Sequence, residues 1–112
     1  MNNLEVYANE IHKITVDKGF WDNFRPVDPF PYYAYKLAMI HSEVTEVMEA
    51  IRKDKGDDEV VEELADIIIR VLDFYIGLKE KGEIADDFDL DEILMDKIEI
   101  NRNRPQRHGV RG

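Results

Sequence analysis

Four acidic residues in the middle of the chain are spaced so that they could bind a cation together. Glu43 and Glu46 are three residues apart. After an interval of sixteen residues, Glu63 and Asp66 repeat this spacing. In a helix, a three-residue step places two side chains at neighbouring positions of one face. Carboxylates that are brought together repel one another, and a bound cation relieves this repulsion. The pattern therefore indicates a metal site if the two pairs meet.

The segment around these pairs predicts that they do meet. Residues 37–73 have the pattern of two amphipathic helices joined by the turn Lys-Asp-Lys-Gly at 53–56. Helices joined by so short a connection are expected to pack side by side and antiparallel. About the centre of this turn, Glu43 then lies level with Asp66, and Glu46 lies level with Glu63. All four carboxylates would sit at one height of the hairpin.

Glu43 is the most informative of the four acids. At 100° per residue, it falls within the apolar side of its helix, whereas Glu46 lies at the edge of that side. A carboxylate that points inward requires a metal, a proton or a partner charge. The apolar stripe beside it contains Leu37, His41, Val44, Met48 and Ile51. Because His41 lies on this stripe, we expect it to be a core residue rather than a metal ligand.

The residue types narrow the choice of metal. Oxygen ligands favour hard cations, so Mg²⁺ is expected, with Mn²⁺ as a substitute. A di-iron site would require a Glu-x-x-His motif on each of two helices, and the three histidines are isolated. Arg70 and Asp73 continue the polar strip of Glu63 and Asp66, and are candidates to support the ligands. A solvated acidic strip would have the same pattern on this helix, and this alternative stays open.

The remaining chain predicts an all-α protein with one domain over residues 1–112. A first helix ends before Gly19, a second starts near Pro31, and a third runs from Asp57 or Asp58, which are good capping residues, to about residue 79. Asp89, with Glu92 three residues later, is typical of the start of a fourth helix. The expected fold is a bundle of four to five helices around the central antiparallel hairpin, with a mobile basic tail at 105–112. The third helix is apolar over too wide an arc for one neighbour, which predicts a homo-oligomer.

Composition excludes several classes of protein. The net charge is −10, which argues against a general nucleic-acid-binding protein. No apolar run approaches the roughly 20 residues that span a bilayer, and no signal peptide is evident, so we expect no membrane association and a cytoplasmic location. The charge is uneven: residues from Lys97 onward carry +4, which leaves −14 for residues 1–96.

Two further segments could contact a nucleotide. On the fourth helix Lys97, Asn101 and Arg104 share a face, and these residue types can bind a polyphosphate, although a solvated helix end would look the same. Residues 20–35 contain seven of the eleven aromatic residues. This aromatic segment could close the core or offer a ring on which a base stacks. The candidate stacking residues are Trp21, Phe24 and Tyr33.

The chain resembles the MazG-like all-α nucleoside triphosphate pyrophosphohydrolases, in their short, single-domain form. The motif of this family is Glu-x-x-Glu, a spacer, and Glu-x-x-Asp, which stands here as EVTE (43–46) and ELAD (63–66). KGFWD at 18–22 and the ending KIEINRNRPQRHG at 97–109 are similar to family members too. The resemblance implies that the four acids are Mg²⁺ ligands and that the face of the fourth helix holds the phosphates. It also implies a homodimer or tetramer that cleaves a nucleoside triphosphate to the monophosphate and pyrophosphate.

Residue chemistry and resemblance suggest the same mechanism. A cation held by the carboxylates would bind the triphosphate and activate a water molecule. Glu43 or Glu46 would orient or deprotonate this water as the catalytic base. Removal of unwanted nucleotides is the expected role, with base and sugar left open. The alternatives are a helical module that binds nucleotide or metal without turnover, and a regulatory oligomer whose acids only face water.

Overall fold

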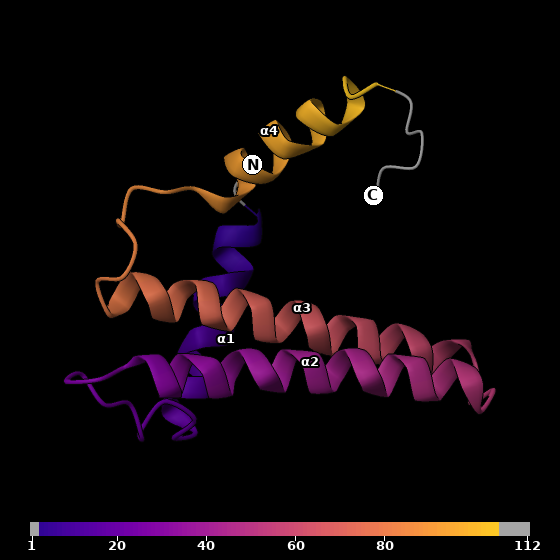
Figure 1. The fold of residues 1–112 in the computed structure, drawn as a ribbon, viewed down its shortest axis with the longest axis horizontal. Coiled ribbons are helices and arrows are strands. Elements are labelled where there is room, and N and C mark those ends of the chain that lie inside the picture. The colour runs from indigo at the N-terminus through magenta and orange to yellow at the C-terminus, as the bar shows by residue number, and fades with distance from the viewer. Residues whose placement is uncertain (1–2, 106–112) are drawn as a thin grey trace.

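The fold contains helices and no strands within residues 3–105, the part of the chain that the computed structural model describes. The elements are α1 (Asn3–Asp17), α2 (Phe30–Arg52), α3 (Asp57–Glu80) and α4 (Leu90–Arg102) (Figure 1). The all-α prediction is confirmed, and four helices are present in the described part. No helix in residues 3–105 is long and apolar enough to span a bilayer.

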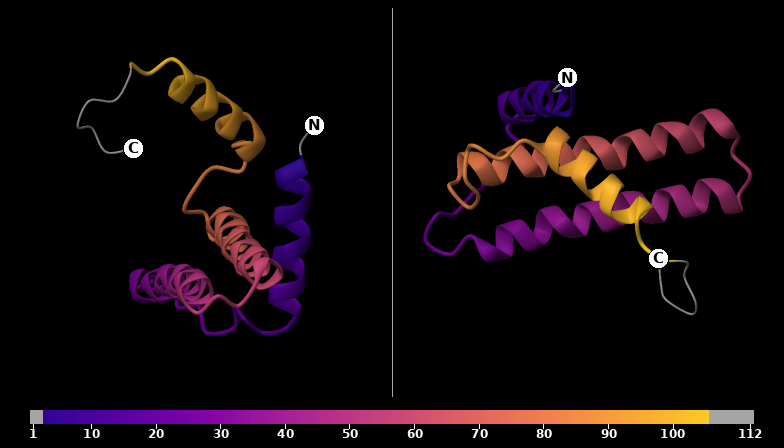
Figure 2. Two further views of the ribbon diagram at one scale, coloured as in Figure 1. Left: turned by 90° about the vertical axis from the view of Figure 1, so that its right-hand side faces the viewer. Right: turned by 90° about the horizontal axis from the view of Figure 1, so that it is seen from above.

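The α2 and α3 helices lie side by side and are joined by the short turn predicted at 53–56 (Figures 1 and 2). The chain leaves α2 through Asp54, whose φ is 53°, and enters α3 through Gly56, whose φ is 104°. Residues with a side chain rarely adopt the second value, so glycine is required there. Asp57 and Asp58 were expected to cap α3 but lie inside its first turn, and Gly56 occupies the cap position. Their negative charges instead interact favourably with the positive, N-terminal end of the α3 dipole.

The third helix lies between α1 and α2 and contacts both of them (Figure 2). Its contact with α1 forms a small apolar core of Ala8, Leu72 and Ile76. The aromatic segment closes one end of this core, which was one of its two expected roles. Trp21 is 5% exposed, and a Cβ atom at position 77 would lie only 2.1 Å from its Cη2 atom. Gly77 therefore allows the indole ring to pack directly on the backbone of α3.

The fourth helix packs on α1 and extends away from α2 and α3 (Figures 1 and 2). As predicted, Asp89 caps it, accepting hydrogen bonds from the backbone N–H groups of Asp91 (2.9 Å) and Glu92 (3.4 Å). Asp91 in turn accepts from the N–H groups of Leu4 (2.9 Å) and Glu5 (3.0 Å) at the start of α1. These caps join the first turns of α1 and α4. Within one chain, α4 contacts α1 and makes no helix-to-helix contact with α2 or α3.

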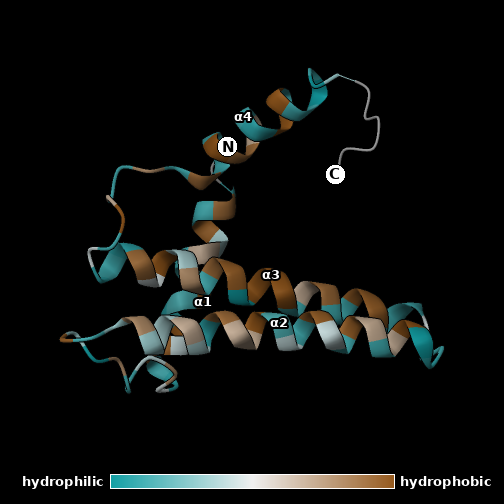
Figure 3. Cartoon of the chain, in the orientation of Figure 1, coloured by the Kyte–Doolittle hydropathy of each residue, from teal (hydrophilic) through white to brown (hydrophobic). Residues whose placement is uncertain are grey.

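Many large apolar side chains are exposed on the hairpin. The stripe of α2 that was expected in a core lies open, including His41, because no described element of the same chain covers it. Brown segments recur along α3 in Figure 3. The exposed side chains of the two helices fall at helical spacing and include Leu37, Val44, Met48 and Ile51 on α2 and Val61, Leu64, Ile68 and Val71 on α3. The tail predicted at 105–112 lies outside the described residues, apart from Pro105.

Candidate functional site

Three of the four predicted acids come together between α2 and α3. Glu43, Glu63 and Asp66 each offer a carboxylate oxygen, and these oxygens all lie within 4.8 Å of one another. The i, i+3 spacing places Glu63 and Asp66 on one face of α3, and the short turn brings Glu43 level with them. Glu46 is exposed and falls outside this group. Three carboxylate oxygens at this separation suit a hard cation such as Mg²⁺ or Mn²⁺.

The charges of this acidic cluster act on Glu63. Desolvation, followed by the negative charges of Glu46, Asp66 and Glu43, raises the pKa of Glu63 above its usual value. Glu46 is therefore close enough to add to the negative field, although it is not one of the three grouped acids. A raised carboxyl pKa means that the ionised cluster opposes folding at neutral pH. A bound cation would remove this repulsion.

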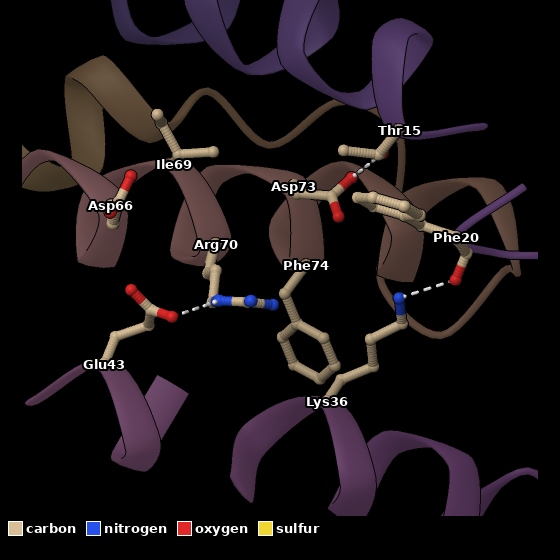
Figure 4. Close-up of a pocket in the computed structure, with 9 residues that line it drawn as sticks. All are labelled: Thr15, Phe20, Lys36, Glu43, Asp66, Ile69, Arg70, Asp73 and Phe74. Carbon is tan, nitrogen blue, oxygen red and sulfur yellow. Dashed lines mark hydrogen bonds and ion pairs between the residues drawn. The ribbon is translucent and has the colours of Figure 1, made fainter. Parts of the chain in front are cut away.

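Glu43 also has a partner within the chain. The Arg70 Nε atom lies 3.2 Å from Glu43 Oε1, and the Glu43 side chain is only 15% exposed (Figure 4). This ion pair supplies the partner that an inward carboxylate requires. The inward position of Glu43, which led us to expect a metal, is therefore satisfied without one. The case for a cation rests on the three grouped carboxylates and on the raised pKa of Glu63.

A cavity of about 240 Å³ adjoins the acidic cluster. Glu43 and Asp66 lie at one end of it, Phe20 and Lys36 lie at the other, and Arg70 lies between them (Figure 4). The cavity thus has the two carboxylates of Glu43 and Asp66 at one end and the Lys36 cation at the other, where Asp73 also lines it. Its complete lining is Thr15, Phe20, Lys36, Glu43, Asp66, Ile69, Arg70, Asp73 and Phe74.

Asp73, at the edge of this cavity, is held by a buried polar network. It is 8% exposed, and it accepts hydrogen bonds from Thr15 Oγ1 (2.6 Å) and from Trp21 Nε1 (3.1 Å to each oxygen). The Nδ1 atom of His12 lies 2.7 Å from Asp73 Oδ1, and its Nε2 atom lies 2.8 Å from Glu80 Oε1. Asp73 therefore ties α1 and the aromatic segment to α3. Its carboxylate is engaged by protein donors, so its structural role is to support the walls of the cavity.

The sequence interpretation missed His12 and Thr15. A histidine four residues after Ala8, on the buried side of the first helix, was the available indication. Its partner on α3 could not be recognised from the sequence, because the contact joins residues 61 positions apart.

The charges of the network depend on one another. Burial alone would lower the pKa of His12, but its hydrogen bonds to Asp73 and Glu80 raise it above the usual value. Burial would raise the pKa of Asp73, but hydrogen bonds from His12, Thr15 and Trp21 lower it. The folded protein therefore favours an imidazolium between two carboxylates.

We expect the stability of the protein to fall as the pH rises through the pKa of His12. A histidine whose pKa is raised by folding stabilises the folded state fully below its unfolded pKa, about 6.5, and loses this effect above the folded pKa. The lowered pKa of Asp73 stabilises the fold above about 3.9 and is lost at lower pH. Urea denaturation between pH 5 and 9 checks the first part of this prediction. A His12→Gln protein should be less stable and should lose the decline; an equal decline in both proteins would contradict the assignment.

The proposed base-stacking residues lie together, with Trp21 buried and Phe24 and Tyr33 half-buried. Trp21 is buried under Gly77, and its ring lies edge-on to that of His12 at 5.1 Å. The Phe24 and Tyr33 rings are 5.9 Å apart. Tyr33 donates a hydrogen bond to Glu83 Oε2 (3.0 Å), and burial together with this contact raises the pKa of Tyr33 to about 12. None of the three lines the cavity. Phe20, which was not singled out from the sequence, does so.

The predicted phosphate-binding residues are not near the acidic cluster within one chain. Lys97, Asn101 and Arg104 are exposed on or just after α4, which packs on α1. The cations that do line the cavity are Lys36 and Arg70. The structure thus brings the acids together but leaves the cationic face of α4 apart from them.

The fold and site define an all-α protein in which a helical hairpin presents carboxylates from both helices to one cavity. The family model of the MazG nucleotide pyrophosphohydrolase domain matches residues 34–108, two thirds of the chain, and the chain belongs to this family. The matched region comprises most of α2 and all of α3 and α4, and it includes the whole acidic cluster. Neither the curated proteins nor the solved structures gave a significant match. The family supports a nucleotide pyrophosphohydrolase type of function and a nucleotide substrate.

Proposed function

We propose that the protein is a Mg²⁺-dependent nucleoside triphosphate pyrophosphohydrolase that releases pyrophosphate and a nucleoside monophosphate. One observation carries this proposal. In a chain of the MazG family, the carboxylate oxygens of Glu43, Glu63 and Asp66 gather within 4.8 Å beside an open cavity. The role that follows is the removal of unwanted ribo- or deoxyribonucleotides.

The acidic cluster would hold the cation. Bound there, Mg²⁺ would neutralise phosphate charge and lower the pKa of a coordinated water molecule. Glu43, Glu63 and Asp66 supply three oxygens, and Glu46, one turn along α2 from Glu43, is the fourth candidate ligand. Glu43 or Glu46 would orient the attacking water or accept its proton. Glu46 has the freer carboxylate for this role, because Glu43 is paired with Arg70.

The proposed activity is tested by product analysis. The protein is incubated with a panel of canonical and damaged ribo- and deoxyribonucleoside triphosphates and Mg²⁺, and pyrophosphate and phosphate are assayed separately. We expect pyrophosphate and a monophosphate in equal amounts, no free phosphate, and loss of turnover with EDTA. Mg²⁺-dependent nucleotide binding without product would instead support a non-catalytic binding module. Phosphate as the product would contradict cleavage between the α- and β-phosphates.

We also propose that the exposed apolar stripes of α2 and α3 are covered by further copies of the chain. The buried apolar residues of one described chain number only five, which is a small core for a protein of this size. Exposed apolar surface of this extent is typical of subunit interfaces. The α4 face with Lys97, Asn101 and Arg104 would then be free to reach phosphates bound to a neighbouring subunit. A dimer and a tetramer both satisfy this arrangement.

Ile68→Glu should disrupt the oligomer. Ile68 is 55% exposed in the middle of the α3 stripe, and an interface that buries a new charge loses several kcal/mol. Light scattering should give a dimer or tetramer for the wild type and a smaller species for Ile68→Glu. Glu62→Gln, on the exposed outer face of α3, is the control and should keep the wild-type mass. A monomeric wild type would contradict the proposal.

A further inference from the structure

A second cavity continues the one beside the acidic cluster. Its volume is about 480 Å³, and it shares the lining residues Phe20, Lys36 and Arg70 with the first cavity. Its other walls come from the aromatic segment and the start of α2, and they include Asn23 and Tyr35. The two cavities therefore adjoin at these three residues. From the first cavity to the second, the groups in their walls are the carboxylates, two cations and an aromatic wall, and we refer to this order as the path.

The two cations stand where the cavities meet. The Lys36 Nζ atom donates a hydrogen bond to the carbonyl oxygen of Phe20 (2.8 Å), and Arg70 is paired with Glu43 (3.2 Å) (Figure 4). Neither cation forms a hydrogen bond or ion pair with Asp73. The carboxylate of Asp73 is instead bonded to His12, Thr15 and Trp21. Burial and the nearby charge of Arg70 lower the pKa of Lys36, although the negative charge of Asp73 acts in the opposite direction. The junction thus holds two cations, partly shielded from solvent, with the carboxylates of Glu43 and Asp73 nearby.

A bound cation would compete with Arg70 for the carboxylate of Glu43. Glu43 belongs to the three acids at the candidate cation site, so a cation bound there would weaken its pairing with Arg70. The guanidinium could then exchange the carboxylate for a phosphate, which it binds with similar geometry. Lys36 lies on the same cavity and offers further N–H donors.

The aromatic end is suited to a base. Phe20 and Tyr35 are 58% and 60% exposed, in contrast to the buried Trp21. Exposed rings beside a cavity can stack on a nucleobase, and the side-chain amide of Asn23 can donate to and accept from its polar edge. The order of groups along the path is therefore acid, cation, aromatic ring, which matches the order of cation, phosphate and base in a bound nucleotide.

We propose that Lys36 and Arg70 form the subsite for the phosphate attached to the nucleoside, with the base in the cavity lined by Phe20, Tyr35 and Asn23. This inference rests on the proposed function and deepens it. In this arrangement the departing pyrophosphate would lie on the far side of the carboxylates, away from Lys36 and Arg70. The nucleoside monophosphate product consequently keeps both contacts, whereas pyrophosphate makes neither.

The binding of the two products, measured separately, tests this assignment. Calorimetric titrations in Mg²⁺ use a panel of ribo- and deoxyribonucleoside monophosphates as one probe and inorganic pyrophosphate as the other. We expect Lys36→Gln and Arg70→Gln each to weaken monophosphate binding by about 10–100-fold, the range for a hydrogen bond to a charged group. Pyrophosphate binding should change less than threefold.

Matched controls separate this effect from general loss of charge or of fold. Arg52→Gln and Lys53→Gln remove exposed cations at the end of α2, outside both cavities, and should bind both probes like the wild type. Lys36→Arg keeps the charge and should retain most of the monophosphate affinity. A melting temperature is recorded for each protein, so that unfolding is recognised.

The binding titrations can fail independently of the assay for pyrophosphate release that tests the proposed function. A wild type that releases no pyrophosphate from any triphosphate refutes the enzyme activity. Unchanged monophosphate binding in both glutamine variants refutes the subsite, as does a wild type that binds no monophosphate. A loss of pyrophosphate binding equal to that of the monophosphate would place the leaving group, rather than the nucleoside-linked phosphate, at Lys36 and Arg70, and would also overturn the assignment.

Discussion

Asp66→Asn is expected to lower the rate of pyrophosphate release by about 10²–10³-fold, the effect of removing one preorganised electrostatic group. Asp66 contributes one of three carboxylate oxygens that lie within 4.8 Å of one another. Its amide isostere keeps the shape of the side chain but loses the negative charge that, in the proposed site, would hold the cation. Because Asp66 is exposed, the substitution should leave the fold intact. The loss therefore reports on the site, and it is measured with the pyrophosphate assay at saturating Mg²⁺.

Glu63→Gln gives a second readout of the same acidic cluster. Desolvation and the neighbouring acids raise the pKa of Glu63, so its ionised form opposes folding. Removing this charge should therefore raise the melting temperature without divalent cations. The rise in melting temperature that Mg²⁺ gives the wild type should be reduced in the same variant. Glu62→Gln, an exposed acid next to Glu63 that is outside the cluster, is the matched control for both measurements. For the first of the two variants, Asp66→Asn, pyrophosphate release at the wild-type rate would refute the proposed metal site.

Asp73→Asn is expected to be the most destabilising of the substitutions considered, at about 3–5 kcal/mol, the range for breaking a buried ion pair. Asp73 Oδ1 accepts from His12, Thr15 and Trp21, and Trp21 also donates to Oδ2. Asparagine removes the buried negative charge opposite the His12 imidazolium, and its amide nitrogen at the Oδ2 position would face the Trp21 N–H instead of accepting from it. Of the two carboxylates that pair with His12, only Glu80 would remain. Since a folded domain is stable by about 5–15 kcal/mol, a loss of this size takes away a large part of the total.

Urea denaturation at one protein concentration measures this loss, because an oligomer gains stability with concentration. Glu80→Gln is the control. It also removes a carboxylate partner of His12, but the Glu80 side chain is 55% exposed, so the cost should be about 1 kcal/mol or less. Equal losses in the two variants would show that the buried position of Asp73 does not matter. Activity lost in proportion to the folded fraction would support a structural role for Asp73 over a role as a metal ligand.

The local features of the protein were predictable from its sequence. The start of α4 at Asp89 follows from a capping interaction between residues two and three positions apart, and the turn at 53–56 follows from its glycine. The meeting of Glu43 with Glu63 and Asp66 needs only two helical periods and a short connection between them. Such features depend on backbone geometry over a few residues, so a single sequence is enough to recognise them.

Other features were decided by contacts between distant segments. The pairing of Glu43 with Arg70, the burial of Trp21 on Gly77 and the network of His12 and Asp73 depend on how helix faces meet. The periodicity of the sequence predicted Lys97, Asn101 and Arg104 on one helical face, whereas α4 ends at Arg102 and Arg104 lies just after it. The same periodicity carried no information about the helix that α4 packs against. The sequence by itself therefore determined the helices and the acidic cluster, because both arise from local spacing. Only the tertiary structure decided which cations lie beside that cluster, because the choice of packing partner depends on side chains far apart in the chain.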